Sequence, residues 1–169
     1  MTAQAVKKSA QGLSVVGISQ MIVSNDPSDI LITYSLGSCV GVTIYDPIRK
    51  IGGLIHCMLP LSKIDREKAA KTPAMFVDTG VSAMLSEAYA LGARREDLIV
   101  KVAGGAHSLN QSDRFRVGER NATVVRKLLW KNDLLLEKED VGGTKPRTVT
   151  LHIATGQVLI RTGLEEVEL

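Results

Sequence analysis

The chain has 169 residues and a formal net charge of +3, and hydrophobic residues make up 44% of it. This length suits one domain with its own hydrophobic core, so the fold needs neither disulfides nor a metal to stabilise it. The positive charge is too small and too dispersed to predict nucleic-acid binding, and two cysteines exclude a disulfide framework.

The N-terminal segment carries no recognisable targeting signal. Residues 1–12, MTAQAVKKSAQG, are small or polar and lack the apolar stretch of a secretory signal. No apolar run approaches the ~18 residues that a membrane-spanning helix needs. We therefore expect a cytoplasmic protein with reduced thiols and no membrane insertion, in which a flexible tail (1–12) precedes a single domain (13–169).

Strand-like segments dominate the first third of the chain. Residues 13–24 and 30–35 are rich in β-branched and other apolar side chains, and turn residues separate them. Hydrophobic side chains alternate along residues 39–46. The turn DPIRK (46–50) then leads into another apolar segment, 51–59, so we predict an antiparallel hairpin from these two segments. This third of the chain predicts a strand-rich meander.

Two amphipathic helices are predicted farther along. The first begins after a cap at Thr72, has Pro73 at its first position, and ends at Gly92. The second covers residues 119–131 and ends at Asn132. Further strands are expected over residues 98–106, 134–141, 148–155 and 157–162. This arrangement predicts an α+β fold of packed, mostly antiparallel or mixed sheets flanked by two main helices.

The segment TYSLGSCVGV (33–42) contains Cys39, which has two interpretations. Free cysteine is among the most buried residue types, so Cys39 could simply pack in the core. Alternatively, Gly37 and Gly41 leave the thiol accessible, and Gly37 can adopt a positive φ in a sharp turn. Such a turn would aim backbone N–H groups around Ser38 and Cys39 at an oxyanion, as a nucleophilic cysteine requires.

His56 is the natural partner of such a cysteine, because the predicted hairpin would bring the two residues opposite each other. Cys57 would then point to the other face of the strand and pack in the core. Since His56 and Cys57 face apart, we predict no metal site. The Thr33 hydroxyl could accept a hydrogen bond from the imidazole, although a threonine also suits a strand for its own sake.

Other polar features favour structural roles. His107 and His152 have no neighbours at ligand spacing. The glycine pairs 104–105 and 142–143 lack a phosphate-loop pattern and are interpreted as turn glycines. The polar loop 107–117, with Arg114, Phe115 and Arg116, either contacts substrate or partner, or is a solvated connection.

Taken together, the ordered motifs resemble the CheD family of chemoreceptor glutamine deamidases over about residues 14–163. Cys39 lies in LGSCVGV, and its separations from Thr33 and His56 match the catalytic set of that family. The other landmarks, in order, are HCMLP (56–60), AGGA (103–106), ERN (119–121), EDVGG (139–143) followed by Arg147, and TG (155–156).

The resemblance implies that Cys39 is the nucleophile, His56 the general base and acid, and Thr33 the residue that orients the histidine. It implies a single domain like cysteine hydrolases related to deamidating toxins, which converts glutamines of methyl-accepting chemotaxis proteins to glutamates without a cofactor. It also implies the chemotaxis phosphatase CheC as a partner. Two alternatives stay open at this point: a receptor methylesterase, and a regulatory module that binds CheC.

Overall fold

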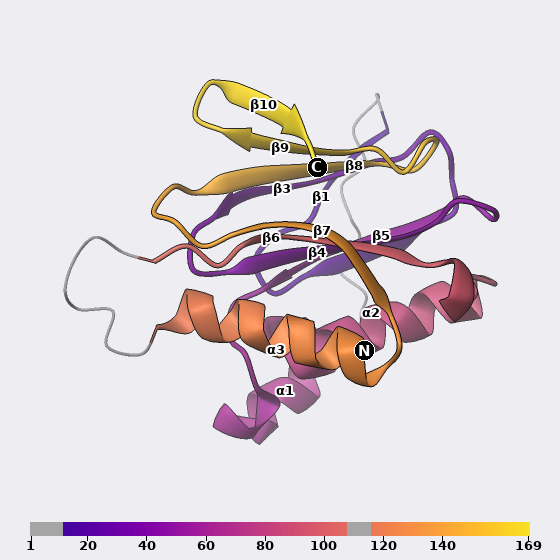
Figure 1. Ribbon diagram of the computed structural model, residues 1–169. Coiled ribbons are helices and arrows are strands. Elements are labelled where there is room, and N and C mark those ends of the chain that lie inside the picture. Colours follow the sequence, from indigo (N-terminus) through magenta and orange to yellow (C-terminus); the bar gives the residue numbers. More distant parts are fainter. Residues whose placement is uncertain (1–11, 108–115) are drawn as a thin grey trace.

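The strands form two stacked sheets and the helices cover one of them, as the computed structural model shows for residues 12–107 and 116–169 (Figure 1). The first sheet has the order β1-β3-β8-β9-β10 and the second the order β2-β5-β4-β6-β7. The strands of the first sheet are β1 (Leu13–Val15), β3 (Ile30–Leu36), β8 (Arg147–His152), β9 (Val158–Thr162) and β10 (Glu165–Glu168). Those of the second are β2 (Met21–Ser24), β4 (Val40–Asp46), β5 (Ile51–Cys57), β6 (Ile99–Gly104) and β7 (Leu135–Val141).

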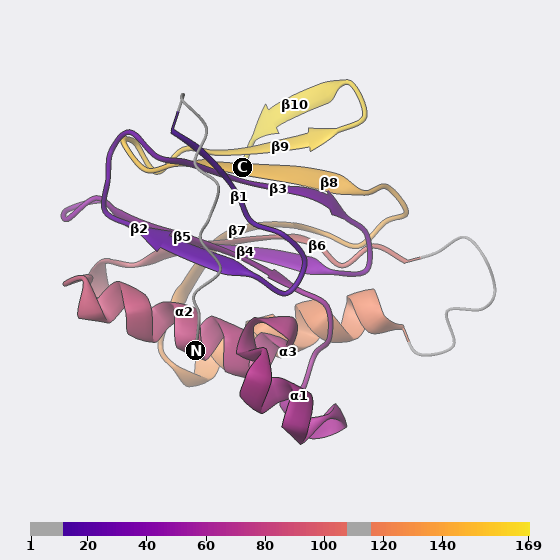
Figure 2. The same cartoon turned by 180° about the vertical axis from the view of Figure 1, so that it is seen from behind.

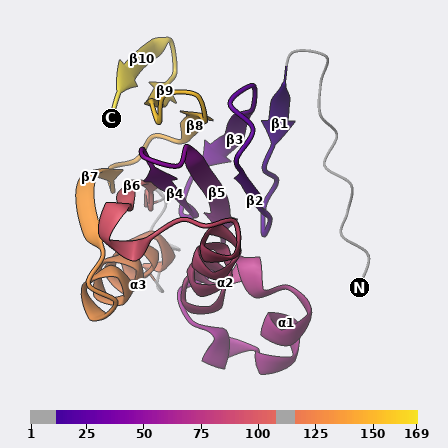
Figure 3. The same ribbon diagram turned by 90° about the vertical axis from the view of Figure 1, so that its right-hand side faces the viewer.

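All α-helices lie on the outer face of the second sheet, which gives three layers when the molecule is seen end-on (Figure 3). The α-helices are α1 (Arg66–Lys71), α2 (Val77–Ala90) and α3 (Val117–Lys131). Short 3-10 turns occupy Ser62–Ile64, Pro73–Met75 and Arg95–Asp97. The predicted α+β class is therefore confirmed. Both sheets are mixed, because β1–β3 and β6–β7 are parallel pairs while every other pair is antiparallel.

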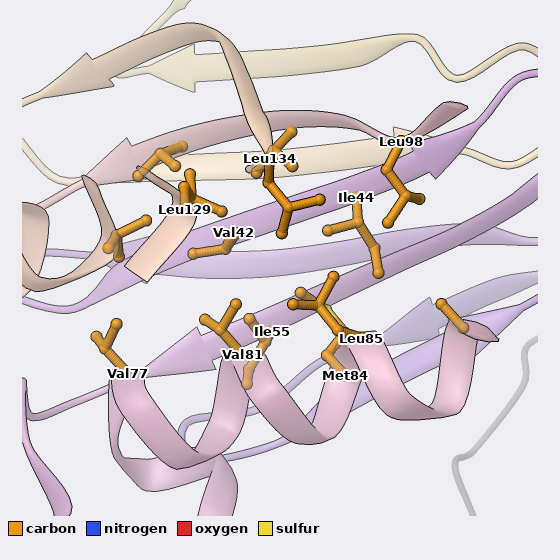
Figure 4. Packing of buried hydrophobic residues seen from close by; sticks show 14 of the residues in the cluster. Val42, Ile44, Ile55, Val77, Val81, Met84, Leu85, Leu98, Leu129 and Leu134 are labelled. Carbon is orange, nitrogen blue, oxygen red and sulfur yellow. The ribbon is translucent and has the colours of Figure 1, made fainter. Parts of the chain in front are cut away.

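The second sheet is buried on both faces because it is the middle layer. Every residue of β4 and β5 is buried. On one face, side chains such as Val42, Ile55 and Val81 form a core with α2 and α3 (Figure 4). On the other face, residues such as Leu54 pack with the first sheet in a separate core. The central strands thus present alternate side chains to two different cores.

The predicted hairpin is confirmed, since β4 pairs antiparallel with β5 from Val40↔Cys57 to Asp46↔Ile51. The predicted meander is wrong. Residues 13–24 do not form one strand, because a turn with a hydrogen bond from Gln20 N to Gly17 O separates β1 from β2. These two strands belong to different sheets, and so do β3 and β4. The chain therefore crosses from one sheet to the other at residues 37–39.

The helices differ from the prediction in three places: α1 was not predicted, α3 begins two residues early at Val117, and the start of α2 is later than expected. Pro73 begins a short 3-10 turn, and α2 begins only at Val77. Thr72 makes no capping hydrogen bond with its side chain, so the expected cap is wrong. The predicted ends hold, because Gly92 has a φ of +107° and the Asn132 N–H bonds the last carbonyls of α3. None of the helices in the described residues is long and apolar enough to cross a membrane.

Candidate active site

Two of the three residues with predicted catalytic roles, Thr33 and His56, are in contact between the sheets, and Cys39 lies in the chain segment that crosses from one sheet to the other. Thr33 extends from β3 of the first sheet and His56 from β5 of the second, and both are almost fully buried. Cys39 is half-buried in the crossover between β3 and β4. Figure 2 shows this crossover at the same end of the molecule as the end of β6 and the start of α3.

The hydroxyl of Thr33 fixes the tautomer of His56. Thr33 Oγ1 lies 2.8 Å from His56 Nδ1 and 2.7 Å from the carbonyl oxygen of Val16. A hydroxyl has one proton, and a carbonyl can only accept, so the Thr33 proton goes to Val16. The Thr33 oxygen therefore accepts a hydrogen bond from Nδ1–H of the imidazole. This leaves the lone pair of the neutral ring on Nε2, where a general base needs it.

The turn that separates β1 from β2 also holds the backbone of His56. The His56 N–H donates to the carbonyl of Gln20 at 3.0 Å, and the His56 carbonyl accepts from Ser19 N at 2.9 Å. The same turn region supplies the Val16 carbonyl that orients Thr33. The break in the predicted strand thus serves to place the histidine.

Burial keeps His56 neutral. Desolvation lowers the pKa of His56 to about 4, because the charged imidazolium would lose its hydration between the sheets. Its Nε2 atom is buried and has no hydrogen-bond partner among the described residues. A buried nitrogen without a protein partner is costly, which makes Nε2 a candidate for a functional role.

Cys39 and His56 lie on the same face of the β4–β5 hairpin, but not directly opposite each other as expected. The register pairs Gly41 with His56 and Val40 with Cys57. Cys39 is therefore diagonal to His56, two positions before Gly41. Gly41 lets the side chain of Leu36 pack over this part of the hairpin, because a Cβ on Gly41 would lie 2.8 Å from Leu36 Cδ1. Hydrogen bonds at resting catalytic sites are often long and tighten when substrate binds.

The two cysteines differ in environment. Burial raises the pKa of the Cys39 thiol, and the N–H of Cys39 itself opposes that effect by favouring the thiolate. Cys57 is fully buried in the core beneath α2, where burial above all raises its pKa, with further increments from Cys39 and Asp78. The prediction that Cys57 is a core residue is confirmed. The resting site holds a neutral thiol beside a neutral imidazole.

Three consecutive carbonyls of the crossover are held by the far end of β6 and by α3. Gly37 O accepts from Ala106 N at 2.8 Å, and Cys39 O accepts from Gly105 N at 2.8 Å. Between them, Ser38 O accepts from Nδ2 of Asn121 at 2.9 Å. Gly37 does not have the positive φ that the sequence suggested, and Ser35 adopts that conformation instead, with φ +56°. A Cβ on Gly37 would meet nothing within 4 Å, so this glycine leaves open space beside the thiol.

Asn121 appeared in the sequence analysis only as part of the motif ERN (119–121), and its place in this site was not predicted. It is fully buried on α3, four residues before the core residue Val125. A polar side chain on the apolar stripe of an amphipathic helix is the signal that could have identified it.

The remaining polar candidates have structural surroundings or lie elsewhere. Gly104, Gly105, Gly142 and Gly143 all have positive φ, a conformation that favours glycine, although Gly104 is the last residue of β6 rather than part of a turn. Across the described ranges, no three His, Cys, Asp or Glu side chains gather as metal ligands. Arg114 and Phe115 of the loop 107–117 lie outside the described residues, and Arg116 is exposed in an ion pair with Glu119.

Comparisons with known proteins give one consistent family. The CheD family model, described as chemotactic sensory transduction, matches residues 58–162. The probable chemoreceptor glutamine deamidase CheD 1 of Syntrophus aciditrophicus (strain SB) is 49% identical over 148 residues, covering 88% of this chain and 92% of that protein. The probable chemoreceptor glutamine deamidase CheD of Solibacter usitatus (strain Ellin6076) is 42% identical over 155 residues, covering 92% of each. A solved structure, the Bacillus licheniformis hypothetical protein YfiH, is similar with a TM-score of 0.45 and 14% identity over 71% of this chain and 49% of that chain.

Proposed function

The chain belongs to the CheD family of chemoreceptor glutamine deamidases, and on that premise we propose that it hydrolyses glutamine side chains of methyl-accepting chemotaxis receptors to glutamate. The observation that carries the proposal is the hydrogen-bonded set of Val16, Thr33 and His56, which leaves a basic nitrogen buried near the half-buried Cys39 thiol. We propose that residues 13–169 form the deamidase unit, because one core joins the second sheet to α2 and α3 and the other core joins the two sheets.

In the first step, Cys39 Sγ attacks the side-chain amide carbon of the glutamine while His56 Nε2 takes the thiol proton. The amide oxygen becomes negative, and the backbone N–H groups of Ser38 and Cys39 stabilise it. Gly37, with open space in place of a side chain, gives the substrate access to these groups. His56 then returns its proton to the departing nitrogen, so that ammonia leaves and a γ-glutamyl thioester remains on Cys39.

In the second step, water hydrolyses the thioester. His56 Nε2 removes a proton from the water, the resulting hydroxide attacks the thioester carbon, and the carbon–sulfur bond breaks. The thiolate takes back the proton from His56, which restores the thiol and releases glutamate in the receptor. Thr33 keeps the imidazole in one tautomer through both steps by accepting from Nδ1–H.

The direct test uses a purified receptor cytoplasmic fragment that carries the amidated modification sites. Mass spectrometry of its peptides should show conversion of specific glutamines to glutamates by the wild-type protein, and no conversion above background by Cys39→Ala. Full activity in Cys39→Ala would refute the assignment of the nucleophile.

A methyl ester at the same position is the competing substrate, since the thiol and the oxyanion-binding groups could also cleave an ester. The same fragment, methylated beforehand, should be processed more slowly than the amide form if deamidation is the main activity. Faster processing of the methylated fragment would show that ester hydrolysis is the main activity.

We also propose that the protein works in the cytoplasm and binds the chemotaxis phosphatase CheC. Both cysteines are unpaired, and a thiol nucleophile stays reduced in that compartment. The CheC interaction rests on the family resemblance. A pull-down in which Cys39→Ala still retains CheC would show that binding and catalysis are separable.

A further inference from the structure

We propose that Asn121 is a positioning residue that fixes the direction of the Cys39 N–H, one of the two oxyanion-binding groups, and links its loop to the strand that carries His56. The inference rests on the proposed deamidation at Cys39 and adds a component to it. Asn121 lies on α3, 82 positions (121 − 39) along the chain from the nucleophile, and its side chain donates hydrogen bonds to the main-chain carbonyls of Ser38 and Met58.

The orientation of the Asn121 amide follows from its partners. The atom that faces Ser38 and Met58 lies 2.9 Å and 3.0 Å from their carbonyl oxygens. Carbonyl oxygens only accept hydrogen bonds, so this atom must be the NH₂ group, which has two protons to donate. The amide oxygen then faces away, and it is buried with no hydrogen-bond partner among the described residues. The side chain thus leaves its own oxygen unpaired while it donates to both carbonyls.

The bond to Ser38 sets the direction of the Cys39 N–H. In a trans peptide, the carbonyl of one residue and the N–H of the next point in opposite directions. Because Asn121 holds the Ser38 carbonyl toward α3, the Cys39 N–H points away from α3. The neighbouring bond from Ala106 N to Gly37 O fixes the Ser38 N–H in the same manner.

The two N–H groups that would bind the oxyanion are not used in backbone hydrogen bonds of the described residues. Within the described residues, the N–H groups of Ser38 and Cys39 donate to no backbone carbonyl. Two successive N–H groups that are held in direction and free of acceptors are what a developing oxyanion needs.

The second bond of Asn121 ties the nucleophile to the base. Met58 follows His56 by two residues, just after β5 ends. One NH₂ group therefore joins the residue before Cys39 to the end of the strand that carries His56. Since catalysis is sensitive to displacements of about 1 Å, loss of this link should lower the rate of the chemical step.

The test compares Asn121→Ala with the wild-type protein on the amidated receptor fragment. We expect kcat to fall by about 10- to 100-fold while KM stays within about twofold, because the bridge acts on the transition state and contacts no substrate. The rate at which iodoacetamide alkylates Cys39 should stay within about twofold of wild type, because that displacement forms no oxyanion.

Two further variants separate positioning from stability. In Asn121→Ser the hydroxyl can bond within the helix instead of bridging, so it should fold and show the same loss of kcat. Val125→Ala removes a core contact on the same helix and Asn132→Ala removes an exposed side-chain bond to Leu128 O. Val125→Ala should be less stable than wild type, and Asn132→Ala should be about as stable as wild type. Both should have a kcat close to that of wild type.

The outcomes are distinct. If wild type deamidates the fragment and Asn121→Ala or Asn121→Ser retains its kcat, the positioning role is wrong while the proposed function stands. If the loss of kcat is matched by Val125→Ala at equal thermal stability, or by an equal loss of alkylation rate, the effect is structural and the inference also fails. If wild type does not deamidate the fragment, the proposed function is wrong, and this inference, which depends on it, is wrong as well.

Discussion

At the scale of single residues, the one proton of the Thr33 hydroxyl determines which tautomer His56 adopts. Thr33 gives its only proton to Val16 O and therefore can only accept from His56. An aspartate in the same place would hold the ring in the same tautomer but would also attract a proton onto Nε2 by its charge. The neutral hydroxyl orients the ring without stabilising an imidazolium, which agrees with the low pKa of His56.

This arrangement predicts different effects for two substitutions of Thr33. Thr33→Ser keeps the hydroxyl and should retain most of the activity. Thr33→Val keeps the shape but leaves the Val16 carbonyl and His56 Nδ1 unpaired, so kcat should fall by about 10- to 100-fold with KM little changed. Steady-state kinetics on the receptor fragment measure both. A rise in KM at constant kcat in Thr33→Val would point instead to a substrate contact.

The buried histidine should also make the protein sensitive to acid. The pKa of His56 is about 4 in the folded state and near its ordinary value of 6.5 when unfolded, so the unfolded chain binds the extra proton first. The free energy of unfolding should therefore fall as pH drops from 6.5 to 4, by an amount on the order of 2 kcal/mol. Urea titrations at several pH values should show this loss in wild type and a smaller one in His56→Gln. Equal slopes in the two proteins would mean that His56 titrates normally.

The state of the resting thiol is open to measurement by alkylation. Because burial raises the pKa of Cys39, its reaction with iodoacetamide should keep accelerating with pH beyond about 8.5 rather than level off near neutrality. Cys57 is fully buried and should not react in the native protein. A plateau below about pH 7 in wild type that disappears in His56→Gln would reveal a thiolate–imidazolium pair instead.

At the scale of elements, the nucleophile lies in a crossover between sheets and depends on the strand end that supports it. Gly104 has a φ of +104°, and a Cβ on it would lie within 2.4 Å of Cys39 O. Gly92 has nearly the same φ, +107°, but nothing within 4 Å of a built Cβ. Alanine substitutions at these two positions therefore distinguish the cost of backbone strain from the cost of a collision with the backbone of Cys39.

We predict that Gly92→Ala costs about 1 kcal/mol of stability and leaves kcat unchanged. Gly104→Ala should cost about 1–3 kcal/mol more and lower kcat at least about tenfold, because Cys39 O and its peptide unit must move. Denaturant unfolding and receptor deamidation assays check the two effects. Normal kcat in Gly104→Ala would show that the loop tolerates displacement at that carbonyl.

The hairpin that carries Cys39 and His56 could be predicted from the sequence, but its register could not. Alternating apolar residues and the turn after Asp46 locate both strands, and alternation correctly separates His56 from Cys57. A difference of two residues in the turn moves the residue opposite His56 from Cys39 to Gly41, and turn composition does not determine that difference. Asn121 is 83 positions from Ser38 and 63 from Met58, and no local pattern reports such contacts.

At the scale of the whole molecule, composition and periodicity gave the class but not the division into sheets. The abundance of strands with two main helices indicates α+β, as found. The alternation of β3 is as compatible with one sheet as with the other, so the pattern cannot show that β3 pairs with β1 and β8. Strand β10 was missed because all four of its residues are exposed and give no apolar signal.

The stacking of the two sheets determines how deeply His56 and Cys39 are buried. The first sheet covers the face of β5 that carries His56, and this removes water from the imidazole and supplies Thr33. The crossover between the sheets places Cys39 at the edge of that covered space, where a receptor side chain can reach it. Burial of the base and partial exposure of the nucleophile both follow from the stacking of the two layers.

The central claim is that Cys39 forms a γ-glutamyl thioester with a receptor glutamine, and acid quenching tests it most directly. Wild-type protein is mixed with the amidated receptor fragment, quenched in acid within the first turnovers, digested and analysed by mass spectrometry. We predict a peptide containing Cys39 joined to a receptor glutamine peptide with loss of ammonia, and none when Cys39→Ala is used. Deamidated receptor that accumulates at the normal rate in Cys39→Ala, with no such adduct in wild type, would contradict the account.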